Sequence, residues 1–244
     1  FASYAELEPH GRAFEPTAAE RAEAAAQPSP ETVRHADATA GLVVTSVFEA
    51  FPGLSAVRTY TRLSSARPLP IEAVSSLNLT VPMRVNCGKI DHSRVFWGDS
   101  AWAVENDWRS RPLRDMSVRN RNQVINPGQS SSRFAMSSAS TWSTGVHEPA
   151  GIVQVEGSRR QSRDFSVMWQ IEHNGPWEWE VGEDDPGLHI SAFGPEYQDH
   201  HWYTELGEGH DFESVPVSFA ISAGDWQQSV AEMTLQRRAL RAAK

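Results

Sequence analysis

Residues 165–193 read FSVMWQIEHNGPWEWEVGEDDPGLHISAF, and this stretch decides the fold class. It contains three short runs rich in apolar and aromatic side chains: Phe165–His173, Trp177–Val181 and Leu188–Phe193. The segments Asn174-Gly175-Pro176 and Asp185-Pro186-Gly187 separate these runs, and Gly, Pro and Asn in such positions indicate turns. Short strands divided by turns, without helices between them, are typical of an antiparallel sandwich or barrel.

The same pattern extends along the chain from Gly41 onward. In Leu42–Phe51, apolar residues recur with period two, as in a strand with one polar face, and such strands favour antiparallel pairing. The other strand-like runs are Ala56–Leu63, Ile71–Val81, Arg94–Val104, Arg133–Ser138, Ile152–Glu156 and Val215–Ser222. We therefore predict an all-β, antiparallel sandwich over residues 41–224.

The two ends of the chain depart from this pattern. Residues 1–40 are predicted to be a helical or irregular segment at the edge of the sandwich, with one short helix over Ala18–Gln27 that Thr17 begins. Residues 225–244 change to a helical period, and we predict a helix over Asp225–Ala242. Its apolar stripe consists of Trp226, Val230, Met233 and Leu240. This stripe needs a partner, either the flank of the sandwich or another domain.

Composition limits the partners. The net charge is −9, from 22 basic and 31 acidic residues, which argues against a nucleic-acid backbone as partner. No apolar run reaches the roughly 20 residues of a membrane span, so we expect no membrane association. The N-terminus lacks the features of a secretory signal, and the only cysteine is Cys87. We expect a cytoplasmic protein whose chain, beginning at Phe1, is part of a longer one.

Motifs for metals, cofactors and catalysis are weak. Asp199-His200-His201 resembles a ligand cluster, but neighbouring residues of an extended segment point to opposite faces. We expect one buried and one exposed ring there, no metal site and no cofactor. Glycosidic chemistry needs two converging carboxylates, and the sequence does not show that any pair converges. The acids considered are Asp99, Glu105, Asp107, Glu178, Glu180, Glu183, Asp184, Asp185, Glu196 and Asp199.

Tryptophan is unusually frequent, with nine in the chain. Trp177 and Trp179 share one face of a predicted strand, and indole rings stack well on sugars. The general alternative is burial in the core, where most tryptophans pack. A carbohydrate-binding module that uses exposed Trp177 and Trp179 is therefore one hypothesis for the function.

A succession of phrases resembles one known family. Trp169-Gln170-Ile171-Glu172-His173-Asn174-Gly175, then Gln198-Asp199-His200-His201-Trp202, and finally Arg237-Arg238-Ala239-Leu240-Arg241 are similar to the end of the N-terminal β-supersandwich domain of family 36 α-galactosidases. Upstream, residues 98–113 (GDSAWAVENDWRSRPL) resemble another stretch of that domain, although Val104 stands where the family usually carries Arg.

The resemblance implies a non-catalytic domain. In that family, two aspartates of a downstream (β/α)8 barrel perform the hydrolysis, and nothing in this chain matches that barrel, so no catalytic residue is assigned. The sandwich packs on the barrel, borders the substrate pocket and contributes to oligomer contacts, which implies a homo-oligomeric parent enzyme. Trp102 and Arg111 are then expected near the pocket.

A self-contained sugar epimerase on a similar supersandwich is a third hypothesis. Its chemistry needs a His and a carboxylate that converge as general acid and base, and the obvious pair is Glu172 and His173.

Overall fold

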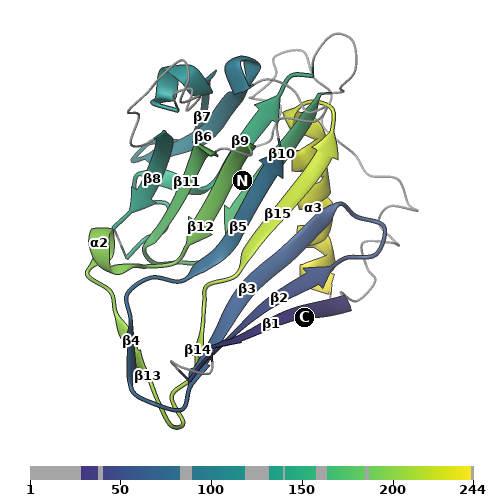
Figure 1. The fold of residues 1–244 in the computed structure, drawn as a ribbon. Helices are drawn as coiled ribbons and strands as arrows, with labels where there is room; N and C mark the ends of the chain where they lie inside the picture. Colours follow the sequence, from purple (N-terminus) through teal and green to yellow (C-terminus); the bar gives the residue numbers. More distant parts are fainter. Residues whose placement is uncertain are drawn as a thin grey trace, which may run out of the picture.

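A computed structural model describes residues 29–37, 41–82, 90–118, 132–139, 141–157, 164–184 and 187–242. Its strands form two main sheets and one short ribbon, with every pair antiparallel (Figure 1). The predicted antiparallel all-β sandwich is therefore confirmed.

The strands of each sheet follow in their spatial order. The large sheet contains β1 (Ser29–Asp37), β2 (Leu42–Ala50), β3 (Ala56–Ser65), β15 (Val217–Ala223), β10 (Phe165–Ile171), β9 (His147–Val155), β6 (Arg94–Ala101) and β7 (Val104–Pro112), with β14 (Phe212–Glu213) paired to β3. The small sheet contains β5 (Ser75–Pro82), β12 (Gly187–Phe193), β11 (Trp177–Asp184) and β8 (Arg133–Ser138). The ribbon pairs β4 (Leu69–Ile71) with β13 (Thr204–Leu206).

The main core lies between the two sheets and follows from the alternation of side chains along each strand. The large sheet contributes the fully buried Trp169 of β10, and the small sheet contributes Trp177 and Trp179 of β11. Aliphatic side chains fill the space around these rings: Leu77, Val81, Val95, Val153, Val155, Val167, Ile171, Val181, Leu188, Ile190 and Val217. Burying one large side chain of this kind contributes about 3 kcal/mol, so this interior holds the sheets together.

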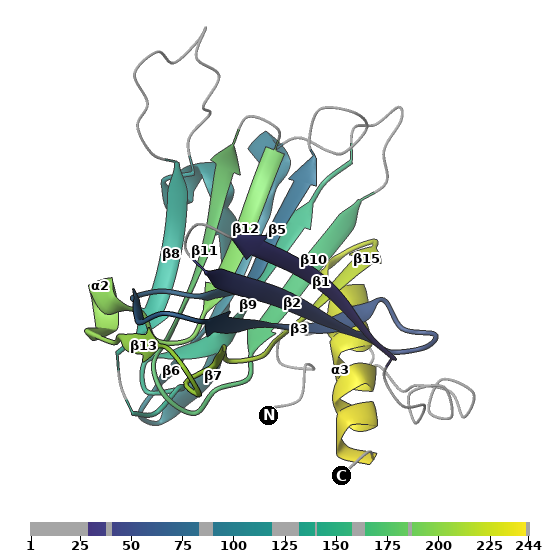
Figure 2. The same cartoon turned by 60° about the horizontal axis from the view of Figure 1, so that its bottom comes forward.

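Helix α3 (Trp226–Ala242) covers the outer face of the large sheet (Figures 1 and 2). The predicted C-terminal helix is confirmed, and the Asp225 side chain caps it by accepting the Gln227 backbone N–H at 3.0 Å. Val230 and Met233 form a second core with apolar residues of the sheet: Ala56, Ile152, Met168 and Ala220. The partner of the apolar stripe is thus the flank of the sandwich itself. No helix in the described ranges is long and apolar enough to span a membrane.

The N-terminal edge differs from its prediction. Ser29–Asp37 is strand β1, paired over its whole length with β2, rather than part of a helical or irregular segment, so the large sheet begins before residue 41. The side chains of residues 31–37 are all exposed, so main-chain hydrogen bonds hold β1 in place rather than apolar burial. The predicted helix Ala18–Gln27 lies outside the described residues.

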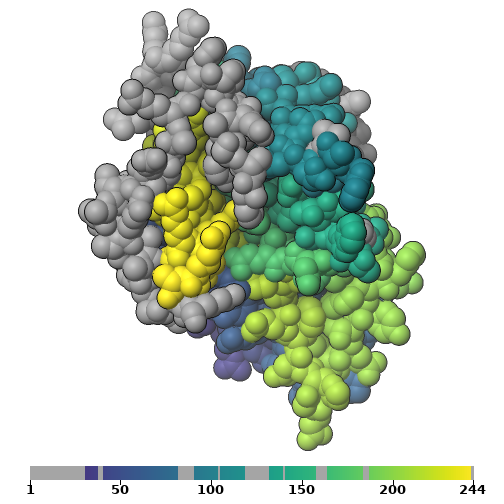
Figure 3. All heavy atoms as spheres, turned by 180° about the vertical axis from the view of Figure 1, so that it is seen from behind, coloured from purple at the N-terminus to yellow at the C-terminus, as the bar shows by residue number. Residues whose placement is uncertain are grey.

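A hairpin divides a run that was predicted as one strand. Arg94–Val104 was expected to be continuous, but β6 ends at Ala101 and β7 begins at Val104 and returns beside it. Ala103 makes this turn with a positive φ of 63°, a conformation that L-residues other than Asn, Asp and Gly rarely adopt. Figure 3 shows α3 in yellow and the residues of this hairpin in teal on the same face of the molecule.

Candidate functional site

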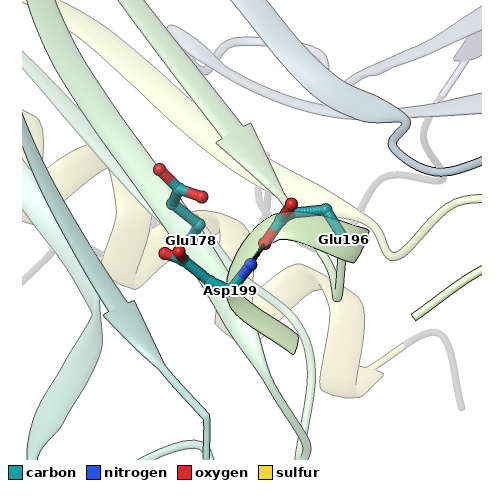
Figure 4. Close-up of side chains that lie close together, drawn as sticks. All are labelled: Glu178, Glu196 and Asp199. Atoms are coloured by element: carbon teal, nitrogen blue, oxygen red, sulfur yellow. Dashed lines mark hydrogen bonds between the residues drawn. The ribbon is translucent and has the colours of Figure 1, made fainter. Parts of the chain in front are cut away.

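Three carboxylates converge on the outer face of the small sheet (Figure 4). Glu178 lies in β11, while Glu196 and Asp199 belong to the short helix α2 (Tyr197–His200) and its start. One oxygen from each residue lies within 4.8 Å of the other two. The structure therefore brings together three of the acids whose convergence the sequence does not show.

The local fold explains this convergence. Because side chains alternate along β11, Trp177 and Trp179 point into the core and Glu178 points outward, beneath α2. Glu196 precedes α2, and its carboxylate accepts the backbone N–H groups of Gln198 and Asp199, as N-capping residues do. Glu196 is thus fixed by the helix start.

Glu178 is electrostatically unfavourable in this position. The residue is only 8% exposed, and within the described part of the chain no group donates a hydrogen bond to its carboxylate. Burial first, and then the neighbouring Asp199 carboxylate, raise the pKa of Glu178 to about 7. The protonated form of Glu178 is therefore favoured up to a much higher pH than for an ordinary carboxyl group.

The cluster is unsuited to hydrolysis of a glycosidic bond. Retaining glycosidases hold two carboxyl groups about 5 Å apart, and one of them has a raised pKa, as Glu178 does here. A sugar must however enter between the two groups, and Glu178 is nearly closed off from solvent. Each Glu196 oxygen already accepts one hydrogen bond of the helix cap, so this carboxylate is held in place and is not free to attack a sugar or to activate a water. The arrangement can share a proton or hold a cation, but it offers no room for a sugar.

His200 and His201 follow directly on the cluster and differ from each other, as expected. The His200 ring is almost fully buried, with Nδ1 at 3.1 Å from Glu196 Oε1. His201 is exposed, ends α2 with a φ of 53°, and packs edge-on against the Tyr197 ring. The two imidazoles therefore do not form a common ligand pair.

Trp177 and Trp179 are not available for stacking on sugars, which corrects the prediction for both. Each is fully buried between the sheets. The Trp179 ring packs edge-to-face on Trp169 at a centroid distance of 5.1 Å, and Trp177 Nε1 donates a hydrogen bond to the Ser143 carbonyl at 2.6 Å. They are core residues, the general alternative for any tryptophan in a sandwich.

Trp102 and Arg111 lie far apart on the β6–β7 hairpin. Trp102 is in the turn and is 89% exposed, whereas Arg111 is paired with Val95 near the other end of β7. Seven residues separate Val104, at the start of β7, from Arg111, or about 23 Å along a strand that rises about 3.3 Å per residue. The structure therefore does not bring the two residues into one place.

A second group of interest, which we call the hairpin rim, lies on the β6–β7 hairpin and on the neighbouring segment 142–147: Asp99, Trp102, Arg109, Trp142, Val146 and His147. Asp99 is central, with Oδ1 at 2.8 Å from His147 Nδ1 and Oδ2 at 3.1 Å from Arg109 Nε. Trp142 is 72% exposed, and the Val146 carbonyl accepts the Ser100 N–H of β6 at 2.8 Å. Sequence reasoning missed His147, because only the pairing of β6 with β9 brings it beside Asp99.

Glu172 and His173 do not act as a pair. The Glu172 carboxylate accepts Arg58 Nε at 2.9 Å and the Ser218 hydroxyl at 2.5 Å. His173 is half-buried, and burial lowers its pKa. Within the described ranges, no hydrogen bond or ion pair joins the two side chains, so the geometry gives no support to the epimerase hypothesis.

The fold matches solved structures of glycoside hydrolases. The α-galactosidase from Lactobacillus brevis aligns with a TM-score of 0.66 and 13% identity over 87% of this chain and 27% of its own. The GH36 α-galactosidases AgaB and AgaA from Geobacillus stearothermophilus align with TM-scores of 0.65 and 0.64 and 14% identity, over 83% of this chain and 25% of theirs.

The chain thus spans about a quarter of the length of the structures that it matches. No protein-family model and no curated protein matches the sequence. At this level of identity the comparison concerns the fold, and the sandwich fold expected from the resemblance is confirmed.

Proposed function

We propose that this chain is the non-catalytic N-terminal sandwich domain of an α-galactosidase-like glycoside hydrolase, whose catalytic barrel is a separate part of the parent enzyme. The observation that carries this proposal is the unequal coverage: 83–87% of this chain aligns with about a quarter of each α-galactosidase. A match over most of this chain and a small share of the other is what an accessory domain produces.

The chemistry of the described residues supports a non-catalytic role. Glu178, Glu196 and Asp199 bring three carboxylate oxygens within 4.8 Å of one another, and Glu178 is too far buried for a sugar to enter between them. Hydrolysis of the parent's substrate, a terminal α-galactoside, is therefore assigned to the barrel, which also supplies the main partner surface.

The hairpin rim is our proposal for the part that faces the barrel and borders its pocket. Trp102 and Trp142 expose large apolar rings there, and aromatic side chains are enriched in protein–protein interfaces. Asp99 of the same rim contacts Arg109 and His147. Arg111 lies farther along the edge strand β7, so it would contact a partner that covers that edge. Homo-oligomerisation of the parent and a cytoplasmic location stay predictions.

A carbohydrate-binding module is the second candidate, now with different residues. Trp102 and Trp142 are the exposed tryptophans of the described ranges, and both could stack on a sugar ring. The two candidates differ in one measurable property: a binding module binds free oligosaccharide by itself, whereas a domain that only borders a pocket does not.

Two measurements on the full chain separate the candidates. The first is release of the aryl group from an aryl α-galactoside, where the accessory-domain proposal predicts no turnover, and clear turnover would refute it. The second is a tryptophan-fluorescence titration with galactose and with raffinose, a sugar that one of the matched α-galactosidases holds in its crystal structure. The absence of a saturable fluorescence change would support the accessory-domain proposal.

A saturable change that Trp102→Ala or Trp142→Ala removes would instead establish the binding module. Trp226→Phe serves as the matched control, because Trp226 is the first residue of α3 and its ring packs against Phe96 rather than on the hairpin rim. The reading frame beyond Lys244 gives an independent test, since a downstream barrel is expected there.

A further inference from the structure

We propose that Glu178, Glu196 and Asp199 form a binding site for a divalent cation, with Ca²⁺ as the preferred ion. One oxygen from each side chain lies within 4.8 Å of the others. Two ligands on opposite sides of Ca²⁺ are separated by about 4.6–5.2 Å, because each Ca–O distance is about 2.3–2.6 Å. The three oxygens therefore fit around one ion without a change in the backbone.

A second observation points to a ligand at this place. Glu178 is more than nine-tenths buried, points into the cluster, and receives no hydrogen bond from any described group. A carboxylate in a residue this far buried, with no donor from the described protein groups, is unfavourable, and proteins leave such groups rarely and for a reason. The nearest cation on the same sheet, Arg133, is bound to Glu180 at 2.7 Å instead. A positive ion at the cluster supplies the missing partner.

The chemistry of the donors favours calcium. All three ligands are carboxylates, which hard cations prefer, and Ca²⁺ accepts irregular geometry and a variable number of oxygens. Asp199 is exposed, so water can complete the coordination on that side. The cluster offers no sulfur ligand, and the neighbouring His200 ring lies with Nδ1 toward Glu196 Oε1, so the site is unlike the nitrogen- and sulfur-rich sites of zinc.

The ion has a structural role in this arrangement. Helix α2 has only four residues, and a helix of that length is not stable without tertiary contacts. Its two acids, Glu196 and Asp199, lie over Glu178 of β11. A cation held by all three fastens α2 to the small sheet, and with it the segment that leads from β12 to the ribbon strand β13.

The rival explanation is a proton in place of the ion. A protonated Glu178 could donate to the Asp199 carboxylate and relieve the same repulsion. The two explanations differ in their response to calcium, because a site already satisfied by a proton shows no saturable binding.

The test is isothermal titration calorimetry with CaCl₂ on the full chain, after treatment with a chelator and its removal. The variants are Glu178→Gln and Asp199→Asn, both of which keep the shape of the side chain. Both are expected to fold, because Asp199 is exposed and the amide introduced by Glu178→Gln resembles the protonated acid. The matched control is Glu205→Gln, an exposed acid of β13 outside the cluster.

We expect one Ca²⁺ per chain with a Kd at or below about 1 mM, weakened at least about tenfold by either cluster variant and unchanged by Glu205→Gln. Calcium at ten times Kd should raise the thermal midpoint of the unsubstituted chain by about 3–5 °C, and that of the cluster variants by less. The proposal is overturned if calcium gives no saturable heat, or if both cluster variants bind as the unsubstituted chain does. Neither result depends on whether the chain belongs to a galactosidase.

Discussion

Gly151 of β9 lies directly opposite Trp169 of β10, and the indole occupies the space where a side chain of residue 151 would be. A Cβ atom at this position would lie 2.8 Å from Trp169 Cε2, well inside normal contact. Trp169 cannot move away, because it is fully buried and packs against Trp179 at 5.1 Å. The glycine is thus required by its neighbour rather than by backbone conformation.

Gly151→Ala is therefore expected to lower the free energy of unfolding by about 1–3 kcal/mol, the usual cost of overpacking a core. Urea denaturation measures this change. Gly207→Ala is the control, because its nearest heavy atom, Pro68 Cα, is 4.0 Å from the added Cβ. Equal stability of the two variants would mean that the Trp169 ring has room to shift.

Trp179 and Trp102 differ strongly in burial, so truncation of the two side chains should have contrasting effects on stability. Trp179→Ala removes a fully buried ring and should cost about 3–5 kcal/mol. Trp102→Ala removes a ring that is 89% exposed and should change stability by no more than about 0.5 kcal/mol. Chemical denaturation of both variants checks the expectation. A large loss in Trp102→Ala would contradict the exposed position of the hairpin turn.

A series of side-chain hydrogen bonds between α3 and the large sheet gives a third prediction. Gln236 is fully buried and donates from Nε2 to Ser218 Oγ at 2.7 Å, while the Ser218 hydroxyl bonds to Glu172. Ser218→Ala leaves the buried Gln236 amide and the partly buried Glu172 carboxylate without this partner, and we expect a loss of about 1–3 kcal/mol. Gln236→Met fills the same space without a polar group and should cost less in denaturant unfolding. A larger loss of stability in Gln236→Met than in Ser218→Ala would show that the Gln236 amide, rather than the Ser218 hydroxyl, is the main contributor to these hydrogen bonds.

The pKa of Glu178 predicts how stability depends on pH when a chelator is present. Because this pKa is raised from 4.5 to about 7 in the folded chain, the folded state binds the proton more tightly than the unfolded state. The resulting stabilisation is complete below about pH 4.5 and is lost as the pH rises through about 7. Asp199, Glu180 and Glu196 oppose the charged form, and Arg133 favours it.

Between pH 5 and pH 8 the unsubstituted chain should therefore lose about 1–3 kcal/mol more than Glu178→Gln, which cannot ionise. Urea midpoints at both pH values measure the difference. Parallel pH profiles for the two proteins would show that Glu178 is not perturbed by burial.

The fold was largely predictable from the sequence where burial controls the pattern. Trp177, Trp179 and Val181 alternate with Glu178 and Glu180, and this period of two requires a strand with one buried face. The last helix was equally clear, since its apolar side chains recur at helical spacing and Asp225 caps it.

The sequence did not predict the β6–β7 turn or strand β1, because backbone conformation and main-chain hydrogen bonds determine both, and neither has a characteristic side-chain pattern. The turn between β6 and β7 uses Ala103 at positive φ, where no Gly, Asn or Pro marks a break. Strand β1 has exposed side chains on both faces, so nothing in its hydrophobic pattern indicates a strand.

The acidic cluster was not predictable for a related reason. Glu178 and Asp199 belong to different elements, and β12 with its following loop determines where α2 crosses β11. Sequence spacing carries no information on that crossing. His147 and Asp99 of the hairpin rim meet in the same way, through the pairing of two strands that are distant along the chain.

The exposed strand β1 has a consequence for local unfolding. Among the described residues, β1 pairs with β2 alone and its residues 31–37 have exposed side chains, whereas β10 lies between β9 and β15 with cores on both faces. Amide hydrogen exchange should therefore be fastest in β1, slower in β2, and slowest in β10, where exchange requires opening of the whole domain. The large sheet then consists of a stable centre and an edge that opens and closes while the rest of the domain stays folded.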